Sequence, residues 1–134
     1  MGFTLVSRTD FDQLMVPYVL VGIGGALGAM LRYFVSSLFP AAVGTAVINV
    51  AGSLIMGLLV GILARVLPSG QEEIRLFVAV GILGGFTTFS AFSLDAVTLW
   101  QRGEITGAGL YVLLSIALSI VGLVAGLWLA RIGA

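Results

Sequence analysis

Neutral polar side chains recur at helical spacing in two apolar stretches of this 134-residue sequence. Asn49 has Thr45 four residues before it and Ser53 four residues after it, so the three share one face of a helix. A second track with the same spacing comprises Tyr111, Ser115 and Ser119. Uncharged amide and hydroxyl donors suit a path for a small anion, which needs hydrogen bonds in place of its water. The same groups are equally suited to joining helices, at about 0.6 kcal/mol per contact.

The segment from Gly84 to Ser93 reads Gly-Gly-Phe-Thr-Thr-Phe-Ser-Ala-Phe-Ser. Two glycines followed by two threonines form a poor helix interior, and Thr and Ser can divert backbone hydrogen bonds. We therefore predict a break in the third helix near the bilayer centre, with a kinked but continuous helix as the alternative. Such a break is tolerated only inside protein or beside water. It would free carbonyl oxygens, which suit a hard monovalent cation.

Two further pairs of residues within the apolar stretches have possible functions. Phe89 and Phe92 are three residues apart, so they share one side just after the predicted break. Their ring edges are electropositive and can favour a small anion, although Phe in a membrane helix is more often in the core or against lipid. Arg32 and Asp95 are the ionisable residues deepest in these stretches, which makes them functional candidates. Each also lies within two turns of a predicted helix end, where snorkelling or a structural hydrogen bond is the alternative.

Several classes of chemistry are excluded by composition. The sequence contains no Cys and no His, which removes disulfides, thiol catalysis, the usual zinc sites and a near-neutral proton shuttle. The apolar stretches hold neither paired carboxylates nor a Ser/His set, so we expect no enzyme activity. Six basic residues, all Arg, balance six acidic ones, and no basic patch exists that would bind nucleic acid.

The elements that must position these residues are membrane-spanning helices. The chain is 60% hydrophobic and only 9% charged, which excludes an ordinary soluble enzyme and predicts a multi-pass protein of the cell membrane, inner or plasma. A span needs about 20 mostly apolar residues, and each must be helical because an open sheet would leave backbone groups unpaired in lipid. The uncharged runs therefore predict an all-α fold with helices over Val16–Leu38, Gly44–Arg65, Ile74–Trp100 and Ile105–Arg131.

We predict two parts of the chain, a surface segment over residues 1–15 and a four-helix transmembrane domain over residues 16–134. Short connections at 39–43, 67–73 and 101–104 join the helices, and the glycines of the first two helices are expected to pack helices together. The arginines show only a weak bias between the two sides of the membrane. That bias permits insertion in both directions, and hence antiparallel dimers, but one fixed orientation is equally compatible with it.

From Val16 to Arg131 the chain resembles the Fluc family of fluoride channels. The matching string GG-x-TTFS-x-F, with GT-x-x-x-N upstream, is highly specific. The residues that carry the resemblance are Gly24 to Tyr33, Gly44-Thr45 with Asn49 and Gly52-Ser53, Gly84 to Ser93, and Tyr111, Ser115 and Ser119.

The resemblance implies an antiparallel homodimer with two parallel pores, each built from both subunits, that exports toxic fluoride passively from the cytoplasm. One structural sodium ion would lie at the dimer centre, bound by the backbone carbonyls of Gly84 and Thr87. Arg32 would shape an aqueous vestibule. Asn49 would donate to fluoride at the middle of the pore, which the resemblance lines further with Thr45, Phe89, Phe92, Tyr111, Ser115 and Ser119.

The sequence departs from the family pattern at two positions. Asp95 stands where the family commonly has Glu, and Ala91 stands where a Thr is frequent. We assign no role to Asp95, Thr88 or Ser90. Two other functional classes stay open on the residues alone. A small dual-topology, proton-coupled multidrug-type exporter would need a central carboxylate in the first helix, where residues 24–28 are Gly, Gly, Ala, Leu and Gly. A non-transporting assembly subunit would use its polar residues only to join helices.

Overall fold

The computed structural model describes residues 8–66 and 71–132, and its regular structure there is helical. Three long helices are α1 (Arg8–Ser37), α2 (Ala41–Val66) and α6 (Ile105–Ile132). A fourth stretch is composite and comprises α3 (Glu72–Ile74), η1 (Arg75–Leu83), α4 (Gly84–Phe86) and α5 (Phe89–Gln101). Four segments are long and apolar enough to cross a membrane, namely Leu14–Ser37, Ala41–Arg65, Glu72–Gln101 and Ile105–Ile132. The predicted all-α fold with four spans is confirmed.

The helix bounds differ from the prediction mainly at the beginning of the chain. α1 starts at Arg8 and continues through Pro17, so residues 8–15, expected as a surface segment, are helical and lead directly into the span. α2 starts at Ala41, two residues before the end of the predicted connection, because the Pro40 carbonyl accepts the Gly44 N–H at 2.8 Å and opens the helix there. Residues 1–7 of the expected segment and residues 67–70 of the second connection lie outside the described residues.

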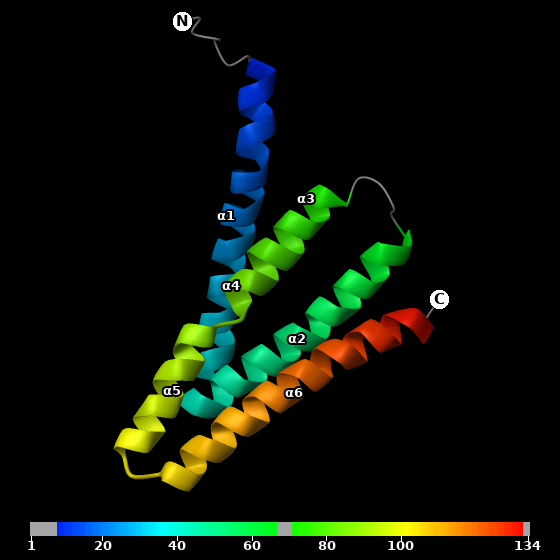
Figure 1. The fold of residues 1–134 in the computed structure, drawn as a ribbon. Coiled ribbons are helices and arrows are strands. Elements are labelled where there is room, and N and C mark those ends of the chain that lie inside the picture. The colour runs from blue at the N-terminus through cyan, green and yellow to red at the C-terminus, as the bar shows by residue number, and fades with distance from the viewer. Residues whose placement is uncertain (1–7, 67–70, 133–134) are drawn as a thin grey trace, which may run out of the picture.

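The helices pack in two groups (Figure 1). In one, α2 packs against α6; in the other, α1 packs against η1 and α4. Glycine makes both approaches possible. A Cβ at Gly28 would meet the Ile82 carbonyl, and a Cβ at Gly57 would meet the Leu123 carbonyl. Because these obstacles are backbone atoms, a side chain at either position would push the helices apart. The packing role expected for the glycines of the first two helices is confirmed at these positions.

A tight turn reverses the chain between α5 and α6. Gly103 has φ +82°, a left-handed conformation that glycine adopts without steric cost. The Gly103 N–H donates to the Trp100 carbonyl at 2.9 Å, and the Glu104 N–H donates to the Leu99 carbonyl at 3.1 Å. These bonds satisfy the last carbonyls of α5 in the manner of a Schellman ending. The turn therefore brings the start of α6 beside the end of α5.

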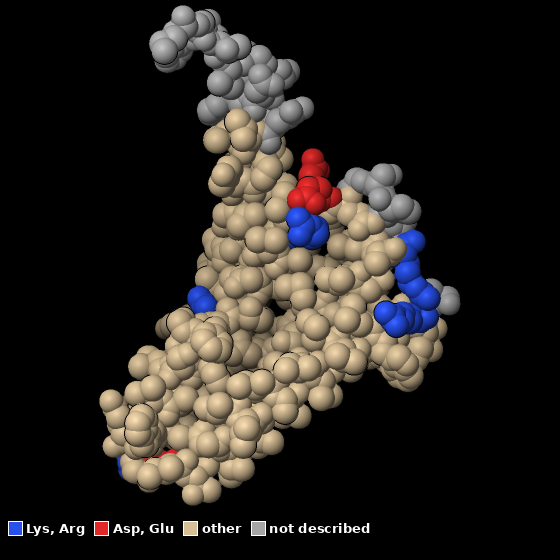
Figure 2. Space-filling model, in the orientation of Figure 1, with Lys and Arg blue, Asp and Glu red and all other residues tan. Residues whose placement is uncertain are grey.

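On the face that Figure 2 shows, the surface is almost uncharged, with small groups of charged side chains mostly towards the ends of the molecule and one basic group about halfway along its left edge. Large apolar residues face outwards on the helices, among them Tyr18, Phe34 and Trp128. A soluble monomer rarely exposes so much contiguous apolar surface, whereas a bilayer accommodates it. The structure therefore agrees with the sequence in describing a multi-pass membrane protein.

Candidate ion-binding site

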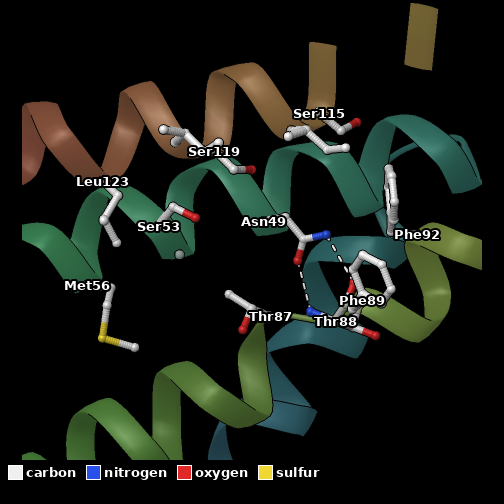
Figure 3. A pocket seen from close by; sticks show the side chains of 13 residues that line it. Asn49, Ser53, Met56, Thr87, Thr88, Phe89, Phe92, Ser115, Ser119 and Leu123 are labelled. Carbon is white, nitrogen blue, oxygen red and sulfur yellow. Dashed lines mark hydrogen bonds between the residues drawn. The ribbon is translucent and has the colours of Figure 1, made fainter. Parts of the chain in front are cut away.

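A pocket of about 450 Å³ opens between α2, α6 and the junction of α4 with α5 (Figure 3). Its lining combines one amide, several hydroxyls, two phenyl rings and aliphatic side chains, and it contains no charged residue. The lining residues are Asn49, Gly52, Ser53, Met56, Thr87, Thr88, Phe89, Phe92, Ser115, Ile116, Ser119, Ile120 and Leu123. Neutral hydrogen-bond donors are therefore the polar groups available to a ligand in this pocket.

Two residues between α4 and α5 have extended backbone. Thr87 has ψ 156°, and Thr88 has φ −154° and ψ 117°. Asn49 of α2 satisfies the backbone of Thr88 on both sides. The Thr88 N–H donates to Asn49 Oδ1 at 2.8 Å, and Asn49 Nδ2 donates to the Thr88 carbonyl at 3.0 Å (Figure 3). The N–H and the carbonyl of Thr88 are thus both paired inside the protein, as a membrane interior requires.

Thr88 is also the N-cap of α5, the residue directly before the helix. Its Oγ1 accepts the Ala91 N–H at 3.2 Å, which is the hydrogen bond of an N-cap. The same Oγ1 lies 3.2 Å from Ser90 Oγ. The structure thereby gives a local role to Thr88 and Ser90, for which the sequence suggested none.

The extended backbone of Thr87 and Thr88 leaves two carbonyl oxygens without the donors that they would have in a continuous helix. In a continuous α-helix the Gly84 carbonyl would accept the Thr88 N–H, and the Thr87 carbonyl would accept the Ala91 N–H. The Thr88 N–H instead binds Asn49, and the Ala91 N–H instead binds the Thr88 hydroxyl. Both carbonyls therefore have acceptor capacity that a helix would have used.

Three aromatic rings form a row beside the pocket. The ring centroids of Phe89 and Phe92 are 5.4 Å apart with an interplanar angle of 39°, and those of Phe92 and Tyr111 are 5.4 Å apart at 32°. Phe92 is 7% exposed, whereas Phe89 at the open end of the row is 77% exposed. The row links the start of α5 to α6 and leaves one ring uncovered in the single chain.

Three of the hydroxyls that line the pocket differ from most other hydroxyls of the helices in how they bond. Ser36 Oγ donates to the Tyr33 carbonyl at 2.9 Å, and Thr45 Oγ1 donates to the Ala41 carbonyl at 3.1 Å. Among the described residues, no protein hydrogen bond involves the side chains that line the pocket at Ser53, Ser115 and Ser119. Three hydroxyls are therefore available to a ligand.

The structure brings most of the predicted pore residues to this pocket. Asn49, Phe89, Phe92, Ser115 and Ser119 line it, together with Thr87 and Thr88. The remaining predicted residues lie outside the lining, and these are Thr45, Tyr111, Arg32, Gly84, Asp95 and Ser90.

Two of the residues outside the pocket contact each other. The Tyr111 hydroxyl donates to Asp95 Oδ2 at 3.4 Å, and the Tyr111 ring stacks against Phe92. Tyr111 therefore joins the aromatic row to Asp95. Arg32 is partly exposed on α1 and contributes nothing to the lining.

The lining also contains residues outside the pore set that the resemblance implied. Ser53 belongs to the polar face of α2, and its position four residues after Asn49 was the available signal. Gly52 and Met56 of α2, with Ile116, Ile120 and Leu123 of α6, complete the wall. Apolar residues in a membrane helix give no comparable signal, because those that face a pocket and those that face lipid have the same composition.

Comparison with known proteins identifies close relatives. Residues 19–127 match the family described as CrcB-like protein, Camphor Resistance (CrcB). A protein from Rhodopseudomonas palustris named fluoride-specific ion channel FluC is 53% identical over 120 residues, which cover 85% of this chain and 96% of the relative. Proteins of the same name are 53% identical over 123 residues in Chelativorans sp. (87% and 98% covered) and 50% identical over 127 residues in Roseobacter denitrificans (87% and 97% covered).

Proposed function

This chain belongs to the CrcB family, and we propose that it is a fluoride-specific ion channel of the cell membrane, as its relatives are named. The observation that carries the proposal is the neutral lining of the pocket. Fluoride is a small, strongly hydrated anion, and a path for it must supply hydrogen-bond donors without trapping it on a fixed positive charge. The pocket offers an amide and three unbonded hydroxyls for this purpose.

Phe89 and Phe92 extend the path beyond the amide. A phenyl ring carries partial positive charge along its edge, so an edge that faces the pocket attracts an anion while its bulk excludes water. Both rings lie at the start of α5, directly after the extended residues that Asn49 holds. Tyr111, whose ring contacts Phe92, and Thr45 would extend the aromatic and hydroxyl surface outside the pocket, and Arg32 would act further out, at an aqueous vestibule.

We place the extended residues near the bilayer centre, because Thr87 lies midway along the span Glu72–Gln101. A sodium ion would be held there by the carbonyl oxygens of Gly84 and Thr87. Those oxygens fit this role, because both have lost their helical donors to Asn49 and Thr88. Oxygen ligands suit a hard cation, and when bound the ion would supply a fixed charge beside the pocket.

The functional unit in this proposal is an antiparallel homodimer with two pores. Phe89 is 77% exposed at the rim of the pocket, and a second copy would cover that ring and close the open side. The carbonyls of two chains would then share one central sodium ion. The weak arginine bias permits the two orientations that this arrangement needs.

Fluoride efflux from liposomes that contain the purified protein tests the proposed function. A fluoride electrode should record rapid efflux with the protein and none from empty vesicles, and a proton gradient should not be required. Efflux that depends on such a gradient would indicate the exporter alternative, and no efflux would indicate an assembly subunit. The lining of the pocket contains no carboxylate to carry a coupled proton, which argues against the exporter.

A further inference from the structure

We infer that Gly52 is a positioning residue whose missing side chain makes room for the Thr87 methyl group and so fixes the extended segment against α2. The inference rests on the proposed channel function, since flux is its principal readout. Gly52 is buried within α2, and both Gly52 and Thr87 line the pocket. The site thus depends on an absent side chain as well as on the polar groups that are present.

The contact is specific to one methyl group. A Cβ at Gly52 would collide with Thr87 Cγ2, and the next nearest atom, Phe86 Cδ1, would be 3.3 Å away. The first obstacle cannot move easily. Thr87 Oγ1 donates to the Leu83 carbonyl at 2.9 Å, and the Thr87 N–H donates to the same carbonyl at 3.0 Å. These two bonds, with the stiff χ1 of a β-branched residue, fix the direction of the methyl group.

Gly52 acts next to a second point of attachment. Asn49 precedes Gly52 by three residues, so both lie on the same face of α2. Asn49 holds the backbone of Thr88, and Gly52 receives the side chain of Thr87. Two adjacent residues of the extended segment are therefore held by one helical face. A displacement of Thr87 would therefore also displace the backbone carbonyls of the segment and Phe89, the first residue of α5.

The test is a double-mutant cycle between Gly52→Ala and Thr87→Ser. Serine lacks Cγ2 but keeps the hydroxyl that bonds to Leu83, so it removes only the atom with which an alanine at position 52 collides. Gly44→Ala is the matched control, because it makes the same change in the same helix where the nearest atom to an added Cβ is 3.4 Å away. Each variant is reconstituted, its folded fraction is measured, and fluoride efflux is expressed per folded protein.

We expect Gly52→Ala to slow efflux by about tenfold or more, and we expect Thr87→Ser to relieve most of this loss. A coupling of this size between two positions is within the range for residues in contact. Gly44→Ala should stay within about twofold of the parent. Thr87→Ser, which removes the methyl contact, is measured as the other single-variant arm of the cycle, and the double variant should conduct at least about threefold faster than Gly52→Ala. If Gly52→Ala does not fold, recovery of folding and efflux in the double variant supports the inference equally.

The inference is overturned if Gly52→Ala conducts like Gly44→Ala, or if Thr87→Ser fails to relieve the loss. Failure of both Gly52 variants to fold also overturns it, because the clash would then not be specific to the methyl group. These outcomes are distinct from failure of the proposed function, in which the parent and the Gly44→Ala control would themselves show no fluoride efflux.

Discussion

The side chain of Asn49 bonds to Thr88 as a neighbouring strand would in a sheet, accepting from its N–H at 2.8 Å and donating to its carbonyl at 3.0 Å. The pairing joins α2 to a residue 39 positions later in the chain. It uses one N–H of the amide, and the second remains available to an anion in the pocket. Asn49 is thus suited both to holding the extended segment and to contacting the ion.

Substitutions of Asn49 should reduce fluoride efflux in the order parent, Asn49→Ser, Asn49→Asp. A serine hydroxyl can still donate to an anion, although it no longer pairs with Thr88. An aspartate places a carboxylate oxygen against the Thr88 carbonyl and, when ionised, repels fluoride in a medium of low dielectric constant. We expect a loss of at least about tenfold for Asn49→Asp, measured in liposomes with protein shown to be dimeric. Parent-like efflux from Asn49→Asp would exclude Asn49 as a pore donor.

Phe92→Ile should slow or abolish efflux without impairing folding. The isoleucine keeps apolar bulk at a position that is only 7% exposed, but it removes the electropositive ring edge and the stacking on Phe89 and Tyr111. Efflux from liposomes and the oligomeric state by size-exclusion chromatography are measured on the same preparation. Unchanged efflux would show that the ring serves only to pack the core.

Ser119→Ala should reduce efflux, because its hydroxyl lines the pocket and no hydrogen bond within the described residues occupies it. Loss of one donor to an anion corresponds to roughly tenfold. Ser36→Ala is the matched control, since the Ser36 hydroxyl already bonds to the Tyr33 carbonyl and lies outside the pocket. Equal efflux from the two variants would contradict a pore role for Ser119.

Thr88→Val should destabilise the protein, whereas Thr88→Ser should not. Valine has no oxygen to accept the Ala91 N–H at the start of α5, and loss of such a cap costs about 1 kcal/mol. The thermal unfolding midpoint in detergent is the measurement. A valine variant as stable as the serine variant would show that the cap contributes little in this setting.

If the chain forms the proposed antiparallel dimer, both orientations should be present in the membrane. A tag at the N-terminus should react with a membrane-impermeant reagent on both faces of cells or of sealed vesicles, because the weak arginine bias directs neither orientation strongly. A protein with a single strong orientation serves as the control. Labelling from one face only would rule out the antiparallel arrangement.

Hydrophobic run length was sufficient to predict the four spans, since about 20 apolar residues are needed for each. It did not predict that α1 would begin at Arg8, because charges near a helix end interrupt an apolar run without preventing helix formation outside the lipid. Nor did it indicate the wide, π-type winding of η1, in which the Gly84 N–H reaches the Ala79 carbonyl. Such winding depends on how a helix packs and carries little local sequence signal.

The candidate site was predictable where the polar residues recur at helical spacing. Asn49, Ser115 and Ser119 stood out because an amide or hydroxyl is costly in lipid and each belongs to a periodic track. The partner of Asn49 was not predictable, because the bond to Thr88 depends on how α2 and α5 come together. The role of Gly52 was hidden for a related reason, since a packing glycine and a glycine that admits a neighbouring methyl group look alike in sequence.

The bond between Asn49 and Thr88 also constrains the order of events during biosynthesis. An unpaired backbone amide and carbonyl are costly in hydrocarbon, so the extended residues cannot rest in lipid alone. Asn49 leaves the ribosome 39 residues ahead of Thr88, and its helix is long enough to be inserted first. The nascent chain therefore already contains the partner for its least lipid-compatible segment when that segment emerges, and moving the segment ahead of α2 by circular permutation would remove this advantage.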